Sequence, residues 1–169
     1  KGSRPFTHHT KAGEEYDSWT MEGILEYYWG EHIHLGHYGS PVNPSKDFRQ
    51  AKVDFVDTMV EWGLTKYHPE LAKRLQNPSG PKVRILDVGC GIGGSSRRLA
   101  RLFPDTAEIT GLSISKQQIE RATELKNAQK LTNVNFVHGD ALDLPFEDHS
   151  FDVIWALESE PHIEDKERY

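Results

Sequence analysis

The stretch ILDVGCGIGGSSRRLA, residues 85–100, decides the fold of this chain. A short apolar run leads into four glycines within six residues, and a segment with helical character follows. Glycines in such a turn allow positive φ angles and let a ligand approach the backbone closely. The helix N-terminus beyond them adds unpaired N–H groups and partial positive charge. The stretch therefore predicts a ligand-binding turn between a buried strand and a helix.

The chain after this turn alternates between strand and helix patterns. We predict strands over 83–88, 107–112, 134–138 and 151–157, and helices over 95–103 and 115–131. Strands separated by helices indicate βαβ units and a parallel sheet, so the fold class is α/β. Four strands built outward from one end form half of a doubly wound sheet. We therefore expect the C-terminal half of the sheet to be missing from this chain.

The chain before the turn is helical rather than alternating. Residues 1–20 are polar and expected to be loose, and a helix follows that ends at Gly30. A second helix is predicted from an N-cap at Ser45 to a stop at Gly63. The connection NPSGPK then suggests two parts, an N-terminal helical cap and lid segment over 1–80 and an incomplete ligand-binding βαβ domain over 81–169.

Composition narrows the class of protein. Of 169 residues, 36% are hydrophobic and 27% are charged, as in ordinary globular proteins. No apolar run approaches the roughly 20 residues that span a bilayer. The net charge of -6 argues against broad nucleic-acid binding. The single cysteine, Cys90, rules out a disulfide framework within the chain and favours a reducing compartment.

Three polar positions discriminate between possible ligands of the turn. The glycine spacing also fits the dinucleotide fingerprint, so an NAD-dependent oxidoreductase stays open as a distant alternative. Asp87, however, would repel a pyrophosphate and suit an ammonium or sulfonium group. Ser113 stands where the dinucleotide fold wants an acid to hold a ribose. Asp140 could accept a hydrogen bond from an adenine amino group beside the N–H of Ala141, or could simply form an Asx turn.

Several segments resemble a known family. LDVGCGIGG, GLSISKQQIERA and GDALDLPFEDHSFDVIWALES resemble the successive motifs of class I S-adenosylmethionine-dependent methyltransferases. YDSWTMEGILEYYWGEHIHLGHYGSP and KDFRQAKVDFVDTMVEWG are similar to methyl-phytyl-benzoquinol methyltransferases of cyanobacterial and plastid type. The resemblance covers roughly residues 16 to 169. It implies the Rossmann-like class I methyltransferase fold, S-adenosylmethionine as cofactor with S-adenosylhomocysteine as product, and C-methylation of a prenylated phenol or quinol in tocopherol or plastoquinone biosynthesis.

The resemblance also implies a set of cofactor contacts. Asp87, Gly89, Gly91 and Gly93 would surround the methionine end of the cofactor. Ser113 and Gln118 would face the ribose, with a capping box predicted between Ser115 and Gln118. Ile114, Asp140 and Ala141 would contact the adenine.

Catalytic and lid residues are expected around the same site. Methylation next to a phenol calls for a general base, and His162 and Glu158 are the first candidates, with His34 behind them. The segment YYWGEHIHLGHYGSP, residues 27–41, is predicted to be a lid with Tyr28, Trp29 and Tyr38 in the pocket wall. Its histidines lack the cysteine or acid cluster that would complete a metal site, so no metal is expected.

Two other functions remain open at this point. One is a small-amine N-methyltransferase of the sarcosine or dimethylglycine type, and the other is a non-catalytic, truncated methyltransferase-fold module. The expected partner is a small, lipophilic methyl acceptor, with no nucleic acid and with peripheral membrane contact allowed. The expected location is the cytoplasm or the stromal side of a plastid.

Overall fold

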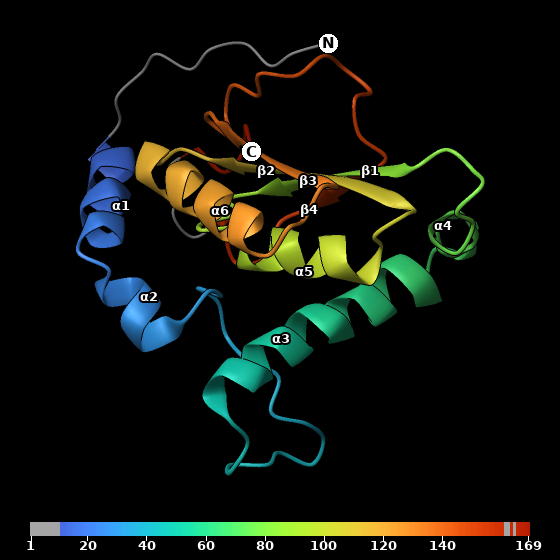
Figure 1. Ribbon diagram of the computed structural model, residues 1–169, viewed down its shortest axis with the longest axis horizontal. Coiled ribbons are helices and arrows are strands. Elements are labelled where there is room, and N and C mark those ends of the chain that lie inside the picture. The colour runs from blue at the N-terminus through green and yellow to red at the C-terminus, as the bar shows by residue number, and fades with distance from the viewer. Residues whose placement is uncertain (1–10, 161–162, 164) are drawn as a thin grey trace.

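A four-stranded parallel sheet forms the centre of the molecule (Figure 1). The structure is a computed structural model and describes residues 11–160, 163 and 165–169. The strands lie in the order β3-β2-β1-β4. They are β1 (Val83–Val88), β2 (Ala107–Ser113), β3 (Val134–His138) and β4 (Val153–Trp155). The predicted parallel sheet is confirmed, although β4 is shorter than expected because only three of its residues pair with β1.

The two faces of the sheet are covered differently. Helices α5 (Gly94–Leu102) and α6 (Lys116–Ala128) connect the first three strands, as predicted. On one face, Ile85, Ile109 and Leu99 belong to a large buried cluster. On the other face, Leu86, Val88 and Leu112 form a smaller buried cluster. Side chains from the connection between β3 and β4 pack against it. The alternation of buried side chains along β1 therefore serves two cores.

The helices before the sheet contribute to the larger cluster. They are α3 (Phe48–Met59), the π-helical segment η1 (Val60–Lys66) and α4 (Pro69–Leu75). Their buried members in this cluster are Val56, Val60, Leu64 and Leu75. The core thus continues across the boundary that the sequence suggested near residue 80.

Two predictions about these helices were wrong. The N-cap of α3 is Asp47, whose carboxylate accepts the N–H of Gln50 at 2.7 Å, and not Ser45. The helical path also continues through Gly63 to Lys66, because burial of Leu64 in the core outweighs the weak helix preference of glycine.

The first helices also differ from expectation. Residues from Lys11 onward form α1 (Lys11–Met21), a region predicted to be loose. Gly23 has a φ of 67° and separates α1 from α2 (Ile24–Trp29), where one helix was predicted; Gly30 ends α2 as predicted. Tertiary contacts explain why α1 is ordered. Asp17 of α1 accepts hydrogen bonds from the Ser115 hydroxyl and the Gln117 N–H at the start of α6.

One edge of the sheet is β4, next to β1. Within the described residues, β4 pairs only with β1, and Ile154 is 61% exposed. The parallel direction of the strands is confirmed, but the predicted order outward from one end is wrong, because β4 pairs with the side of β1 opposite to β2. In the part of the chain that the structure describes, no helix is long and apolar enough to cross a membrane.

Candidate functional site

A cavity of about 360 Å³ lies at the C-terminal ends of the strands. Its floor is the glycine turn together with residues that follow β2, β3 and β4. Its other wall comes from residues 11–35, which comprise α1, α2 and the segment up to Leu35 and are called the cover below. The lining residues of the cover are Lys11, Ala12, Tyr16, Glu31, His32, Ile33 and His34. A site at this edge of a parallel sheet is where ligands bind in such folds.

The three alternating glycines of the turn all have positive φ angles, but their surroundings differ. Their φ values are 73° at Gly89, 56° at Gly91 and 79° at Gly93. A Cβ on Gly91 would meet no atom within 4 Å, so this glycine faces open space on the cavity. A Cβ on Gly89 would overlap Ser159, and one on Gly93 would lie 2.5 Å from the ring of Phe136. Gly93, which we predicted beside the methionine end, is absent from the cavity lining and packs against β3 instead.

Asp87 provides a buried carboxylate beside the turn. It is 2% exposed, lines the cavity at the end of β1, and accepts a hydrogen bond from the Ser96 hydroxyl at 2.5 Å. Burial raises the pKa of Asp87 to about 6, because the loss of hydration outweighs the hydrogen bond. At neutral pH the carboxylate is therefore ionised and places a negative charge in the cavity wall.

Ser113 and Gln118 form a hydrogen-bonded pair on the lining. Ser115 is the N-cap of α6, as predicted, and its hydroxyl accepts the N–H of Gln118 at 3.1 Å. The other hydrogen bond of the predicted capping box, from the Ser115 N–H to the Gln118 side chain, is absent. The side-chain oxygen of Gln118 instead accepts from the Ser113 hydroxyl at 2.7 Å. The Ser113 hydroxyl in turn accepts the N–H of Ser115. The amide of Gln118 is thereby oriented, with its NH₂ group as the remaining polar end.

Ile114, Asp140 and Ala141 also lie on the cavity lining. Asp140 forms the Asx turn that was the simpler alternative, because its carboxylate accepts the N–H of Leu142 at 2.8 Å. The turn holds this carboxylate at the cavity wall. Of the predicted cofactor contacts, all except Gly93 are thus brought to one cavity.

His32 and His34 are buried side by side, and a hydrogen bond joins their rings. The two rings lie 3.1 Å apart from His32 Nδ1 to His34 Nε2, and His34 Nδ1 lies 2.7 Å from the carbonyl oxygen of Leu35. Because a carbonyl only accepts, His34 Nδ1 carries the proton and its Nε2 accepts from His32. Burial and the neighbouring histidine lower the pKa of His32 to about 3, and burial also lowers the pKa of His34. Both rings are therefore neutral near pH 7.

This arrangement bears on the three base candidates. His34 has both ring nitrogens engaged within the cover. Glu158 lines the cavity, has a φ of 58°, and accepts the N–H of Leu35 through one carboxylate oxygen at 3.0 Å. His162 lies outside the described residues. In the part of the chain that the structure describes, no group of three or more histidine, cysteine or acidic side chains is arranged to hold a metal ion.

The predicted lid covers the cavity with other side chains than expected. Tyr28 is 68% exposed, and neither it nor Trp29 nor Tyr38 belongs to the lining. Trp29 packs instead against Phe48 of α3, with the ring centroids 5.7 Å apart. Among the described residues, the tyrosine on the lining is Tyr16 of α1, which was missed because residues 1–20 were expected to be loose.

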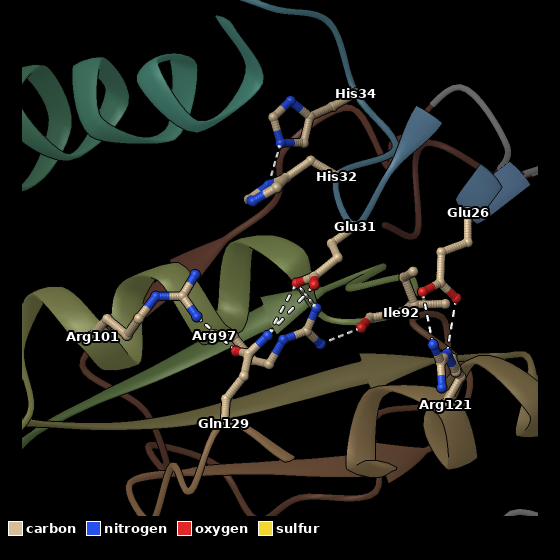
Figure 2. A network of polar contacts seen from close by, with 9 residues as sticks. All are labelled: Glu26, Glu31, His32, His34, Ile92, Arg97, Arg101, Arg121 and Gln129. Atoms are coloured by element: carbon tan, nitrogen blue, oxygen red, sulfur yellow. Dashed lines mark hydrogen bonds and ion pairs between the residues drawn. The ribbon is translucent and has the colours of Figure 1, made fainter. Parts of the chain in front are cut away.

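Polar contacts hold the cover in place. The buried Lys52 donates to the carbonyl oxygens of Trp29 and His32, both at 2.8 Å. Burial and the charge of Arg49 lower the pKa of Lys52 to about 8. Glu26 forms a bidentate ion pair with Arg121 of α6, as Figure 2 shows. These contacts, rather than a shared apolar core, fix the cover over the cavity.

A comparison with known proteins identifies the family. Residues 85–169 match the methyltransferase domain family. A curated relative, 2-methyl-6-phytyl-1,4-hydroquinone methyltransferase of Synechocystis, is 46% identical over 164 residues, which are 97% of this chain and 46% of the relative.

Solved structures show the same arrangement. The [4+2]-cyclase SpnF has a TM-score of 0.74 and 26% identity, covering 99% of this chain and 55% of its own. A putative sarcosine dimethylglycine methyltransferase from Galdieria sulphuraria has a TM-score of 0.64 and 31% identity, covering 83% of this chain and 48% of its own. The chain spans about half the length of the proteins it matches. With half of its residues matched by the family, and with the sheet and glycine turn expected of such a domain, the chain belongs to the methyltransferase domain family.

Proposed function

We propose that this chain is the cofactor-binding part of an S-adenosylmethionine-dependent methyltransferase whose acceptor is a prenylated phenol or quinol. The observation that carries the proposal is the ionised, buried Asp87 beside the open face of Gly91. A carboxylate at this point attracts the ammonium group of an amino acid and repels a pyrophosphate. The site therefore favours S-adenosylmethionine over a dinucleotide.

The residues on the cavity fit the parts of this cofactor. Asp87 would pair with the ammonium group, and the backbone of Gly89 and Gly91 would lie along the methionine part. The oriented amide of Gln118, held by Ser113, would donate to a ribose hydroxyl. Asp140 and Ala141 would contact the adenine edge, with Ile114 against its face. S-adenosylmethionine, when bound, supplies a methyl group on a positively charged sulfur.

The remaining lining residues would serve the methyl acceptor. Methylation of a ring carbon next to a phenol needs a group that takes the phenolic proton. Glu158 is the strongest of the three candidates, because it lines the cavity and only one of its carboxylate oxygens is held by the cover. Tyr16 and the neutral histidine pair would exclude water from the reacting groups. His162 stays a prediction.

The acceptor class rests on similarity to the Synechocystis hydroquinone methyltransferase. An acceptor of this kind is lipophilic, so peripheral contact with a membrane and a plastid or cytoplasmic location remain predictions. The small-amine alternative has the similarity to the sarcosine dimethylglycine methyltransferase in its favour. An amine acceptor would not need the Glu158 carboxylate as a base, which makes the two alternatives separable.

Two measurements test the proposal. Calorimetric titration of the chain with S-adenosylhomocysteine should show one binding site, and NAD should not compete for it. Absence of binding by the folded chain would refute the cofactor assignment and favour a non-catalytic module. A radiolabelled methyl-transfer assay should then label a prenylated quinol, and Glu158→Gln should abolish most of the transfer. Transfer to sarcosine with the quinol unlabelled would refute the acceptor class.

A further inference from the structure

Arg97 of α5 occupies an unusual position between the glycine turn and the cover. Its side chain is fully buried, with 0% exposure. One guanidinium nitrogen donates to the carbonyl oxygen of Ile92 in the turn, and another donates to the carboxylate of Glu31 in the cover at 2.7 Å (Figure 2). Its Nε has no partner among the described residues. A buried charge is costly unless it is paired, so the contact with Glu31 is needed for Arg97 to stay in place.

Glu31 is correspondingly fixed by Arg97. Burial opposes ionisation of Glu31, but the hydrogen bond and charge of Arg97 outweigh it and lower the pKa of Glu31. The amide of Gln129 donates to the same carboxylate at 3.3 Å. The backbone of Glu31 also lies directly against α5, since a Cβ on Gly94 would overlap the carbonyl oxygen of Glu31. The cover therefore rests on the first turn of α5, next to the glycine turn.

Both partners of Arg97, Glu31 in the cover and Ile92 in the turn, lie on the cavity lining next to other lining residues. Glu31 is followed by His32, Ile33 and His34, all of which line it. Ile92 adjoins Gly91, whose open face lies on it. A single guanidinium thus joins the wall formed by the cover to the wall formed by the turn.

We infer that Arg97 is a positioning residue that couples the glycine turn to the cover, so that cofactor binding at the turn and seating of His32–His34 over the cavity occur together. The inference rests on the proposed function for the identity of the cofactor. It assigns Glu31 to the same unit. The geometry distinguishes this ion pair from that of Glu26 with Arg121, because the Arg121 side chain is 37% exposed and that pair touches neither the turn nor the cavity.

Glu31→Gln and Glu26→Gln form a matched pair of variants for the test. Each removes one carboxylate charge from the cover, and Glu31 is itself 38% exposed, so both variants are expected to fold. Hydrogen exchange followed by mass spectrometry would be measured on peptides covering 31–35 and 89–95, with and without S-adenosylhomocysteine, together with calorimetric binding.

The expected result is specific to Glu31→Gln. Exchange should rise in both segments of the ligand-free variant, although only one was altered, and S-adenosylhomocysteine should bind about tenfold more weakly. Glu26→Gln should leave the 89–95 segment and the binding unchanged. The inference is overturned if Glu31→Gln raises exchange in the cover alone, or leaves both segments as in the unaltered chain. If the unaltered chain binds no S-adenosylhomocysteine, the proposed function fails, and the coupling is still judged by exchange in the ligand-free proteins.

Discussion

The sheet and the cover form opposite walls of one cavity, yet they are held by different forces. The sheet is fixed by buried apolar side chains, with Ile85, Leu99 and Ile109 at 0% to 1% exposure. In the cover, α2 buries none of its residues and α1 buries only a glycine. Ion pairs and hydrogen bonds to α3, α5 and α6 hold it instead. The rigid wall, formed by the sheet, holds the proposed cofactor contacts, and we expect the polar wall, formed by the cover, to separate from it at a much smaller cost in free energy.

The largest expected effect is in the sheet core. Leu99→Ala should lower the free energy of unfolding by about 2–5 kcal/mol, because it removes a fully buried side chain and leaves a cavity. Chemical denaturation measures the change. Ile24→Ala in the cover, where the side chain is 50% exposed, should cost about 1 kcal/mol or less. Equal losses at the two positions would break the contrast between the two walls.

The next effect separates two glycines of the turn. Gly93→Ala should destabilise the chain by about 2–4 kcal/mol, because the new methyl group meets the ring of Phe136 at a positive φ. Gly91→Ala should cost only about 1 kcal/mol, since its methyl group points into open space, but it should weaken binding of S-adenosylhomocysteine. Denaturation and calorimetry on both variants test this. The reverse pattern would show that Gly93, and not Gly91, faces the ligand.

Much of the rigid wall was predictable from sequence, and the cover was not. The bounds of β1 and β3 and the Ser115 cap follow from local patterns of apolar residues and capping side chains. The cavity contacts around Asp87 and Ser113 follow because parallel strands end at one edge. Such features depend on residues close together in the chain.

The parts that were missed depend on distant partners. Helix α1 is tied down by contacts between Asp17 and the start of α6, roughly a hundred residues later. Trp29 faces away from the cavity because Phe48 and Lys52 of α3 hold its ring. Nothing in the local pattern near Tyr16 or Trp29 indicates which of the two lies on the cavity. Arg97 was likewise missed, since a polar residue in a helix gives no sign that it will be buried.

A smaller effect concerns Asp87 in the rigid wall. Its pKa of about 6 in the folded chain exceeds the ordinary 3.8, so the folded state favours the protonated form. The stability this contributes is present below pH 3.8 and is lost as pH rises through about 6. Asp87→Asn should therefore stabilise the ligand-free chain at pH 7 by about 1–3 kcal/mol. Thermal and chemical unfolding across this range measure it; a variant that is less stable at pH 7 would contradict the assigned cost of ionisation.

The smallest effect is expected at the edge of the cover. Glu26→Gln should change the free energy of unfolding by less than about 1 kcal/mol, because the ion pair with Arg121 is partly exposed and screened by solvent. The difference from the unaltered chain should shrink further in high salt. A loss of several kcal/mol in denaturation experiments would place this pair with the core rather than with the cover.

In the proposed function, ionised Asp87 recognises the ammonium group of the cofactor. The most direct measurement is the dissociation constant of S-adenosylhomocysteine for the chain between pH 4.5 and 8, determined by calorimetry. Affinity should be constant above about pH 6 and should fall about tenfold per pH unit below it, as Asp87 takes up a proton. Asp87→Asn should bind weakly at every pH in this range. Affinity of the unaltered chain that does not change across pH 6, or tight binding by Asp87→Asn, would contradict the account.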